Sequence, residues 1–186
     1  MNWHVSIPTG HDLTLKTRLV TSENLTTYCE IGIQAYLDHY THLWEDQNPA
    51  PYFNRYYLLE RASKDLENPA FVHGFLEVSG TLAGIFKLDL TKEHPNFFPG
   101  NSLFLEKLYL KKAHTGCGYG GLLLRQFMDW GLELNLGGLW LETMFKGPAR
   151  QFYLKQGFRH LGNTAVPYPQ VKESERAMWI MGIDLK

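Results

Sequence analysis

The sequence has almost no net charge, which limits the partners that it can attract over a distance. Its 18 lysines and arginines are balanced by 19 aspartates and glutamates, so the formal net charge is -1, and the isoelectric point is about 6.7. Such a chain has no global electric field that would gather nucleic acid or an anionic membrane surface. We therefore expect neither a nucleic acid nor a membrane as a partner, and an anionic ligand must be held by local geometry.

Cysteine is scarce, and long apolar runs are missing. The two cysteines, Cys29 and Cys117, stand in unlike contexts and offer neither a disulfide framework nor a metal-binding pair. No segment has about 18 apolar residues, and the amino terminus lacks a basic stretch followed by an apolar run. These absences predict a cytoplasmic protein that is neither exported nor inserted in a membrane.

Side-chain clusters that would bind a metal or activate a thiol are also missing. Cys117 stands between glycines, where a nucleophilic thiol is one alternative, but no Cys/His arrangement is readable around it. The histidines lack the carboxylate or cysteine partners that complete a close ligand set. We therefore predict no metal site.

What the sequence does contain is enough apolar material for one substantial core. Hydrophobic residues make up 44% of the chain and charged residues 20%, without any low-complexity run. A chain of 186 residues can bury about two-thirds or more of its unfolded surface around one core. We expect a single domain over residues 1–186.

Hydrophobic periodicity and turn residues predict a mixed α/β fold. The expected strands cover residues 13–19, 71–78, 81–90, 102–111, 139–145, 158–162 and 177–185. Four helices are expected: from about 22 to 48, from about 51 to 68, from the glycine cluster to about 136, and from 148 to 156. The second of these should have Leu58, Ala62 and Leu66 on its inner face. Ser79-Gly80 is typical of a tight antiparallel hairpin. Only one parallel crossover is evident, which disfavours a large doubly wound sheet.

A cluster of glycines lies between an expected strand and an expected helix. Residues 108–110 lead into residues 113–121, which include Gly116, Gly118, Gly120 and Gly121. Successive backbone amides in such a loop converge on phosphate oxygens, and the helix dipole favours negative charge there. A pyrophosphate is the natural ligand, although glycines alone are equally typical of a turn or a helix start.

The same cluster satisfies the G-x-G-x-x-G pattern of dinucleotide-binding folds through Gly116, Gly118 and Gly121. Those folds place this turn after their first strand and repeat the crossover several times. Here the cluster follows an antiparallel run past the middle of the chain, and Glu142 lies inside the following strand, not at its end. A nicotinamide or flavin enzyme therefore ranks below the interpretation that follows.

Two ordered motifs resemble those of the GNAT superfamily of N-acetyltransferases. The run Leu108-Tyr109-Leu110, a short spacer and then Gly116-x-Gly118-x-Gly120-x-x-Leu123-Leu124 looks like the acyl-CoA-binding motif of that family. Downstream, residues 149–158 are similar to its other signature, an alanine followed by Phe-Tyr and then Gly-Phe. The resemblance implies a mostly antiparallel central sheet flanked by helices, with acyl-CoA at a splayed pair of strands. The first 70 residues match in pattern only.

The resemblance implies a role for each matching position. Backbone groups of residues 108–110 would hold the pantetheine arm of coenzyme A as an added strand, and amides of the glycine loop would hold its pyrophosphate. Tyr153 matches the tyrosine that protonates the departing thiolate in many members, which suits a phenol donor; a tyrosine in the core face of a short helix is the alternative. The implied cofactor-binding residues are Leu108, Tyr109, Leu110, Thr115, Gly116, Cys117, Gly118, Tyr119, Gly120, Gly121, Lys146, Arg150 and Tyr153.

The sequence departs from the family pattern at two positions. Thr115 stands where the family usually has arginine or glutamine, so a phosphate contact is lost unless His114, Lys111 or Lys112 replaces it. Lys146 stands where an asparagine often contacts pantetheine. Lys146 and Arg150 either meet the adenosine phosphates or are ordinary surface charges.

Amine acylation requires a base because an ammonium ion has no free lone pair. Glu106 is our first candidate, because it stands two residues before Leu108 and strand alternation would place both on one face. Glu77 and His73 on the neighbouring strand are second choices. Exposed positions on a strand are the alternative for all three residues.

The early helices concentrate aromatic and imidazole side chains that would shape an acceptor site. Such a wall either holds a cation by its ring faces or packs in the core. Its members are Tyr36, His39, Tyr40, His42, Trp44, Tyr52, Phe53, Tyr56 and Tyr57.

The sequence therefore predicts transfer of an acetyl group from acetyl-CoA to a primary amine of a small molecule or a peptide. Tyr153 would be the acid and Glu106 the base. A non-catalytic acyl-CoA sensor is the alternative, and a dinucleotide oxidoreductase is a weaker one. The acceptor, the acyl chain length and the oligomeric state, with a homodimer among the options, stay open.

Overall fold

Strands and helices are distributed along the whole of the described chain. We describe a computed structural model for residues 7–9 and 13–186. Its strands are β1 (Ile7–Thr9), β2 (Leu13–Leu19), β3 (Phe71–Val78), β4 (Thr81–Asp89), β5 (Ser102–Leu110), β6 (Gly138–Met144), β7 (Arg159–Ala165) and β8 (Ala177–Asp184). Its α-helices are α1 (Leu25–Tyr40), α2 (Ala50–Tyr56), α3 (Leu59–Glu67), α4 (Tyr119–Glu133) and α5 (Pro148–Lys155). The expected mixed α/β class is confirmed.

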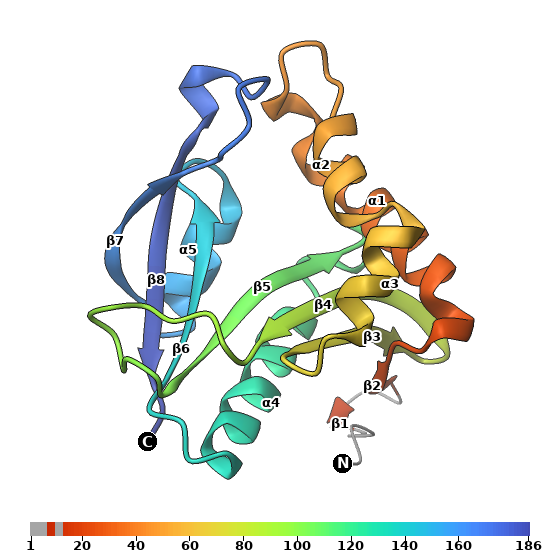
Figure 1. Ribbon diagram of the computed structural model, residues 1–186. Coiled ribbons are helices and arrows are strands. Elements are labelled where there is room, and N and C mark those ends of the chain that lie inside the picture. Colours follow the sequence, from red (N-terminus) through yellow and green to blue (C-terminus); the bar gives the residue numbers. More distant parts are fainter. Residues whose placement is uncertain (1–6, 10–12) are drawn as a thin grey trace.

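One sheet of eight strands carries the fold, in the order β1-β2-β3-β4-β5-β6-β8-β7. Among the strands of the described residues only β5 and β6 are parallel, and they pair through residues 102–105 and 138–141. Beyond these residues β5 stays paired with β4 as far as Leu110, and β6 stays paired with β8 as far as Met144. The sheet therefore opens between β5 and β6, as Figure 1 shows. The expected mostly antiparallel sheet with a splayed strand pair is confirmed.

Helices cover both faces of this sheet and enclose two main cores. Leu123 and Phe127 of α4 and Tyr153 of α5 pack in one core with strand residues such as Leu103 and Phe86. Residues of α1, α2 and α3 pack in the other with Phe75 and Ile85. In Figure 1, α3 lies in front of β3 and β4, α2 lies above them, and α4 lies below the sheet. None of the helices in the described residues has the length and apolar character needed to cross a bilayer.

The early helices differ from the prediction in their ends. The first α-helix stops at Tyr40 and not near residue 48, and the second expected helix is split into α2 and α3. The split occurs because Tyr57 turns inward against α1, so closely that a Cβ on Gly32 would lie 2.5 Å from the Tyr57 ring. Leu58 then takes an extended conformation and is 48% exposed. The prediction that Leu58 faces inward is therefore wrong, whereas Ala62 is buried as expected.

The predicted turns agree with the structure. Ser79 and Gly80 have φ angles of 48° and 82°, as a two-residue hairpin turn of the primed type requires. The final strands were also expected, but their order in space was not. β8, the last strand, lies between β6 and β7, because hydrogen bonding and not chain order decides neighbours in a sheet.

Candidate active site

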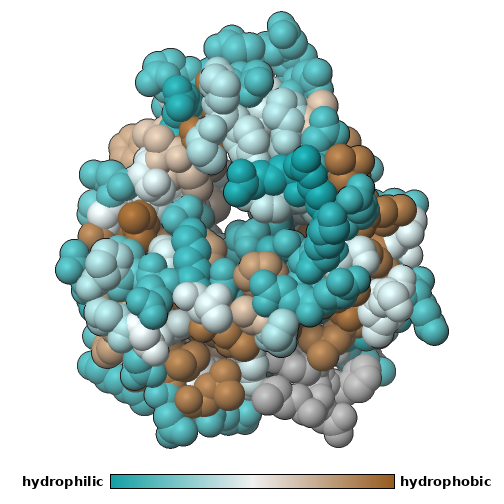
Figure 2. Space-filling view, viewed as in Figure 1, coloured by the Kyte–Doolittle hydropathy of each residue, from teal (hydrophilic) through white to brown (hydrophobic). Residues whose placement is uncertain are grey.

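A cavity of about 1120 Å³ lies where β5 and β6 diverge. Figure 2 shows its mouth as an opening framed mostly by hydrophilic residues. We call one part of it the loop half, which is lined by residues of β5 (Leu108 and Leu110), the glycine loop (residues 114–121) and α5. We call the other part the chamber half, which is lined by residues of α1, α2 and α3, by charged residues of β4 and β5, by Lys92 after β4 and by Glu142 of β6. The two halves form one continuous space.

The glycine loop presents free backbone amides to the loop half. Gly116 and Gly118 have φ angles of 76° and 84°, which L-residues other than glycine rarely adopt. A Cβ at either position would meet no atom within 4 Å. Over the described part of the chain, the amides of residues 116–120 donate to no backbone carbonyl, and α4 begins at Tyr119. The loop is therefore an open cradle of N–H groups at a helix N-terminus, which suits an anion.

The edge of β5 also points unused backbone groups into the opening. The amide of Lys111, just after β5, donates to the carbonyl of Ala83 in β4 at 2.9 Å. Because backbone groups alternate sides along a strand, those of Leu108 and Leu110 point away from β4. His39 of α1 lies with Nε2 3.0 Å from the Leu110 carbonyl oxygen. The remaining groups of this edge can pair with an extended ligand, as the sequence predicted.

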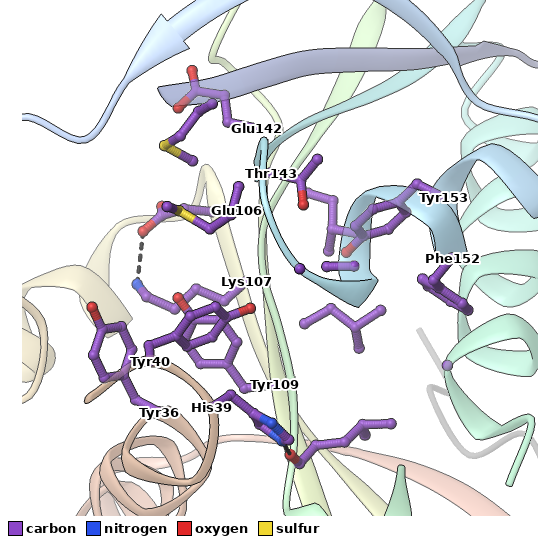
Figure 3. Close-up of a pocket in the computed structure, with 18 of the residues that line it drawn as sticks. Tyr36, His39, Tyr40, Glu106, Lys107, Tyr109, Glu142, Thr143, Phe152 and Tyr153 are labelled. Carbon is purple, nitrogen blue, oxygen red and sulfur yellow. Dashed lines mark hydrogen bonds and ion pairs between the residues drawn. The ribbon is translucent and has the colours of Figure 1, made fainter. Parts of the chain in front are cut away.

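Tyr153 reaches the cavity from α5, and its phenol is protonated at neutral pH. The side chain is buried, and this burial, together with Tyr40, raises the pKa of Tyr153 well above the ordinary value. Figure 3 shows its hydroxyl directed into the cavity, on the side opposite Tyr40. α5 lies close against the glycine loop, since a Cβ on Gly120 would be 3.1 Å from the Phe152 ring. The packing of α5 against the glycine loop therefore fixes the position of Tyr153 relative to that loop.

Other expected cofactor residues lie in different places. Thr115, Tyr119 and Gly121 line the cavity, as does Lys146, whose ammonium pairs with Glu175 at 2.8 Å. Tyr109 lines it too, but its ring faces the chamber half. The structure does not bring the other two expected residues to the cavity wall. Cys117 is exposed, and the Arg150 guanidinium lies against the rings of Phe145 and Trp179 at 4.6 and 4.8 Å.

A β-bulge changes the expected face of Glu106. The register between β4 and β5 shifts between Lys87 and Leu88, so that Lys87 pairs with Lys107 and Leu88 pairs with Leu105. Glu106 is the extra residue. As a result Leu105 and Leu108 both pack on the α4 side, whereas Glu106 faces the chamber half together with Lys107. The prediction that Glu106 shares a face with Leu108 is therefore wrong.

Glu106 is fully engaged by two buried lysines. Its Oε1 lies 2.7 Å from Lys107 Nζ and its Oε2 lies 2.9 Å from Lys87 Nζ, and Figure 3 shows the pair with Lys107. Burial by itself would raise the pKa of Glu106, but the two lysines outweigh it and lower the pKa to about 2. Burial lowers the pKa of Lys107 to about 8, although Glu106 opposes that shift. A carboxylate held in this way is a weak proton acceptor.

The second-choice bases do not line the cavity. His73 is 6% exposed, and its Nδ1 lies 3.2 Å from the Tyr28 hydroxyl. Burial, together with Lys87 and Lys107, lowers the pKa of His73 to about 4, so the ring is neutral. Glu77 stands at a register shift of β3. Within residues 7–9 and 13–186, no group of three or more His, Cys, Asp and Glu side chains could hold a metal ion.

The expected aromatic wall divides into two sets. Tyr36, His39, Tyr40, His42, Tyr52 and Tyr56 line the cavity, and Figure 3 shows three of them. Trp44, Phe53 and Tyr57 do not line it and pack in the core with α1, where Tyr36 and Tyr52 are buried as well. The lining set is rigid, because the rings of Tyr36 and Tyr52 stack at 4.3 Å and the hydroxyls of Tyr52 and Tyr109 lie 2.8 Å apart. Core packing therefore applies to members of both sets, and the lining residues are the ones placed where they could meet a ligand.

Several charged residues of the chamber half were missed by the sequence analysis. They are Arg55, Asp65, Lys87, Lys92, Lys107 and Glu142. Lys87 and Lys107 are 2% and 4% exposed. A lysine in the middle of an apolar strand was the signal that could have pointed to them, because buried lysines are rare unless they are paired.

The segment that follows α1 and the loop that precedes β8 meet above the chamber half. Trp44 and Val171 form an isolated antiparallel bridge. The Glu45 amide donates to the Gln170 carbonyl at 3.1 Å, and the Lys172 amide donates to the Leu43 carbonyl at 2.9 Å. This contact roofs the space between α1 and the loop that precedes β8.

The chain matches a family of known proteins. The model of the Acetyltransferase (GNAT) family matches residues 33–158. An uncharacterized N-acetyltransferase in the pepI 3' region of Lactobacillus delbrueckii subsp. lactis is 24% identical over 139 residues, which are 74% of this chain and 80% of that protein.

Solved structures agree in fold. PaiA N-acetyltransferase from Thermoplasma acidophilum, in complex with coenzyme A, has a TM-score of 0.72 at 18% identity and covers 91% of this chain and 98% of its own. Spermidine N-acetyltransferase from Vibrio cholerae, in complex with CoA and spermine, has a TM-score of 0.67 at 16% identity, with 92% and 95% covered. The family match spans the splayed strands, the glycine loop and α5, so this chain belongs to the Acetyltransferase (GNAT) family.

Proposed function

We propose that this protein transfers an acetyl group from acetyl-CoA to the primary amine of a small molecule or a peptide. Acetyl-CoA is the co-substrate of GNAT enzymes, and acyl transfer to an amine is the activity that family membership supports. One observation carries the proposal for this chain. A single cavity joins the open amide cradle, the free edge of β5 and the Tyr153 hydroxyl to a chamber large enough for an acceptor.

In this proposal the backbone of the loop half places the thioester. Amides of residues 116–120 hold the diphosphate, and the groups of Leu108 and Leu110 that point away from β4 pair with the pantetheine arm. Lys146, which lines the cavity, is a candidate for a side-chain contact with a phosphate, and this requires it to leave Glu175. Arg150 and Cys117 are not assigned a contact, because they do not line the cavity.

The transfer step uses Tyr153 as the proton donor. The neutral amine nitrogen attacks the thioester carbon and forms a C–N bond, and the tetrahedral intermediate then breaks its C–S bond. The departing thiolate takes the phenolic proton of Tyr153, and the proton lost by the nitrogen returns to the phenolate through water. A phenol whose pKa is raised by burial enters each turnover protonated, which suits this role.

For Glu106 we propose a role other than the base that the sequence suggested. Both of its oxygens are bound by lysines and its pKa is about 2, whereas an efficient base has a pKa near the working pH. We propose that Glu106 positions Lys87 and Lys107 in the wall of the chamber half.

Replacement of Tyr153 tests the proposal. We expect Tyr153→Phe to lower kcat by about 100-fold or more, in line with loss of a general acid, while the dissociation constant for CoA stays within about twofold. Release of free thiol from acetyl-CoA, with a panel of amines as acceptors, reports kcat, and calorimetry reports CoA binding.

Tyr28→Phe is the matched control, because Tyr28 is a tyrosine with 2% exposure outside the cavity wall. Its kcat should equal that of the unmodified protein. Equal kcat values for the two variants would remove Tyr153 from the mechanism. Absence of CoA binding by the folded protein would overturn the proposed function itself.

A further inference from the structure

The chamber half is lined by the protein's own cations, and each of them lies over an aromatic ring. Lys92 Nζ is 3.8 Å from the Phe104 ring centroid, and Lys87 Nζ is 4.0 Å from that of Phe71. Lys107 Nζ and the Arg55 guanidinium lie 3.9 and 5.4 Å from the same Tyr56 ring. The ring faces of Phe71, Phe104 and Tyr56, which would attract a cationic ligand, are therefore already used by side chains of the chain itself.

The carboxylates of the chamber half are engaged as well. Glu106 bridges Lys87 and Lys107, Asp65 pairs with Lys87, and Glu142 pairs with Lys92 at 2.9 Å. Four cations thus face three carboxylates in this half. No acidic group is left over for a second ammonium of the acceptor.

Arg55 is the cation without an acidic partner. It is exposed on α2, lines the cavity, and forms no ion pair with any carboxylate of the described residues. Lys107 contacts the same Tyr56 ring as Arg55. Within the described residues its one ion-pair partner is Glu106, which also pairs with Lys87. Together these two cations leave an uncompensated positive charge around Tyr56, where an oxyanion would be stabilised.

We propose that the acceptor is a small amine that also carries a carboxylate, and that Arg55 and Lys107 bind this carboxylate across the Tyr56 ring. The inference rests on the proposed acyl transfer and names the substrate class for it. The carboxylate end anchors the molecule in the chamber half and the amine extends toward Tyr153. The roof between Trp44 and Val171 restricts the space above the chamber half, which favours a small molecule over a peptide.

This assignment differs from what a polycation needs. The spermidine N-acetyltransferase of similar fold is described in complex with spermine, a ligand with several ammonium groups. In the chamber half of this chain such a ligand would meet four cations and no free carboxylate. Like charges at this distance in a partly buried site cost free energy, so we expect polyamines to be poor acceptors.

Matched acceptor pairs that differ by one carboxylate test the inference. The pairs are phenylalanine and phenethylamine, leucine and 3-methylbutylamine, and 4-aminobutanoate and butylamine, with spermidine as the polycation. Thiol release from acetyl-CoA gives kcat/KM for each, and calorimetry on the CoA-loaded protein gives the affinity. We expect the carboxylate member of at least one pair to exceed its partner and spermidine by 10-fold or more.

Arg55→Gln then locates the anchor, with Arg61→Gln as its control, because Arg61 is an exposed arginine of α3 that does not line the cavity. Arg55→Gln should raise KM for the carboxylate acceptor about 10-fold and change KM for its partner amine less than twofold. Arg61→Gln should change neither value. An equal effect of Arg55→Gln on both members of the pair would overturn the role of Arg55.

The two proposals can fail separately. If carboxylate amines bind to the CoA-loaded protein but no thiol is released with any acceptor, the acceptor class stands and the transfer activity is overturned. If thiol is released fastest with spermidine or with the plain amines, the transfer activity stands and the acceptor class is overturned. If no amine binds or reacts, both are overturned.

Discussion

The two halves of the cavity are built from different parts of the polypeptide. The loop half consists mainly of backbone groups within residues 108–121, next to α5. The chamber half consists of charged and aromatic side chains from α1, α2, α3, β3, β4, β5 and β6 and from the segment after β4. The loop half can therefore tolerate many side-chain changes but few changes of backbone geometry. The stability of the chamber half depends on the pairing of each charged side chain with its neighbours.

The largest effect should come from breaking the charge balance of the chamber half. Glu106→Gln leaves Lys87 with Asp65 alone and Lys107 without an ion-pair partner. Removal of one partner from a buried ion pair costs about 3–5 kcal/mol. We expect urea unfolding at pH 7 to show a loss of this size.

The pH dependence of this loss gives a second measurement. The folded pKa of Glu106 is about 2, below the reference value of 4.5. A depressed pKa means that the contribution of Glu106 is present above pH 4.5 and is lost as the pH falls toward 2. The difference in stability between the unmodified protein and Glu106→Gln should therefore shrink below pH 4.5. If Glu106 were the base instead, the variant would lose kcat most at low pH and little stability.

A smaller effect should come from the backbone of the loop half. Gly118→Ala places a Cβ in the open space of the cradle at a φ of 84°. We expect CoA affinity to fall about 10- to 100-fold, or about 1.4–2.8 kcal/mol, because the cradle changes shape and the methyl group faces the phosphates. Calorimetry with CoA measures this change.

Gly80→Ala separates backbone strain from ligand binding. Gly80 has a φ of 82° and equally open surroundings, but it lies in the hairpin between β3 and β4. Both variants should lose about 1–2 kcal/mol of stability from the left-handed conformation. Only Gly118→Ala should weaken CoA binding, and equal CoA affinities in the two variants would contradict a backbone-built phosphate site.

The smallest effect should come from a side chain of the loop itself. Cys117 is exposed, and its Sγ lies 3.6 Å from the Thr115 carbonyl oxygen. If the loop acts through its backbone, Cys117→Ser should change kcat and CoA affinity by less than about twofold, within the ±0.5 kcal/mol of ordinary surface substitutions. Loss of thiol release in this variant would revive the nucleophile hypothesis for Cys117.

Much of the fold could be predicted from the sequence because it depends on local signals. Alternation gave correct strands at residues 13–19 and 71–78, and Ser79-Gly80 marked the hairpin. The ends of the early helices were less accurate, because contacts between Tyr57 and α1 override the continuous helical pattern near Leu58. The chain order of residues 158–185 likewise did not reveal that β8 lies between β6 and β7.

The sequence alone determined the loop half, since its glycines are adjacent in the chain and their conformational freedom is a property of the residues themselves. Only the tertiary structure decided the chamber half. There a single extra residue in β5 turns Glu106 and Lys107 to the same face, and Lys87, Asp65 and Arg55 reach them from elements remote in the chain. Charges act through space, so their pairing and pKa values follow from the fold and not from the order of residues.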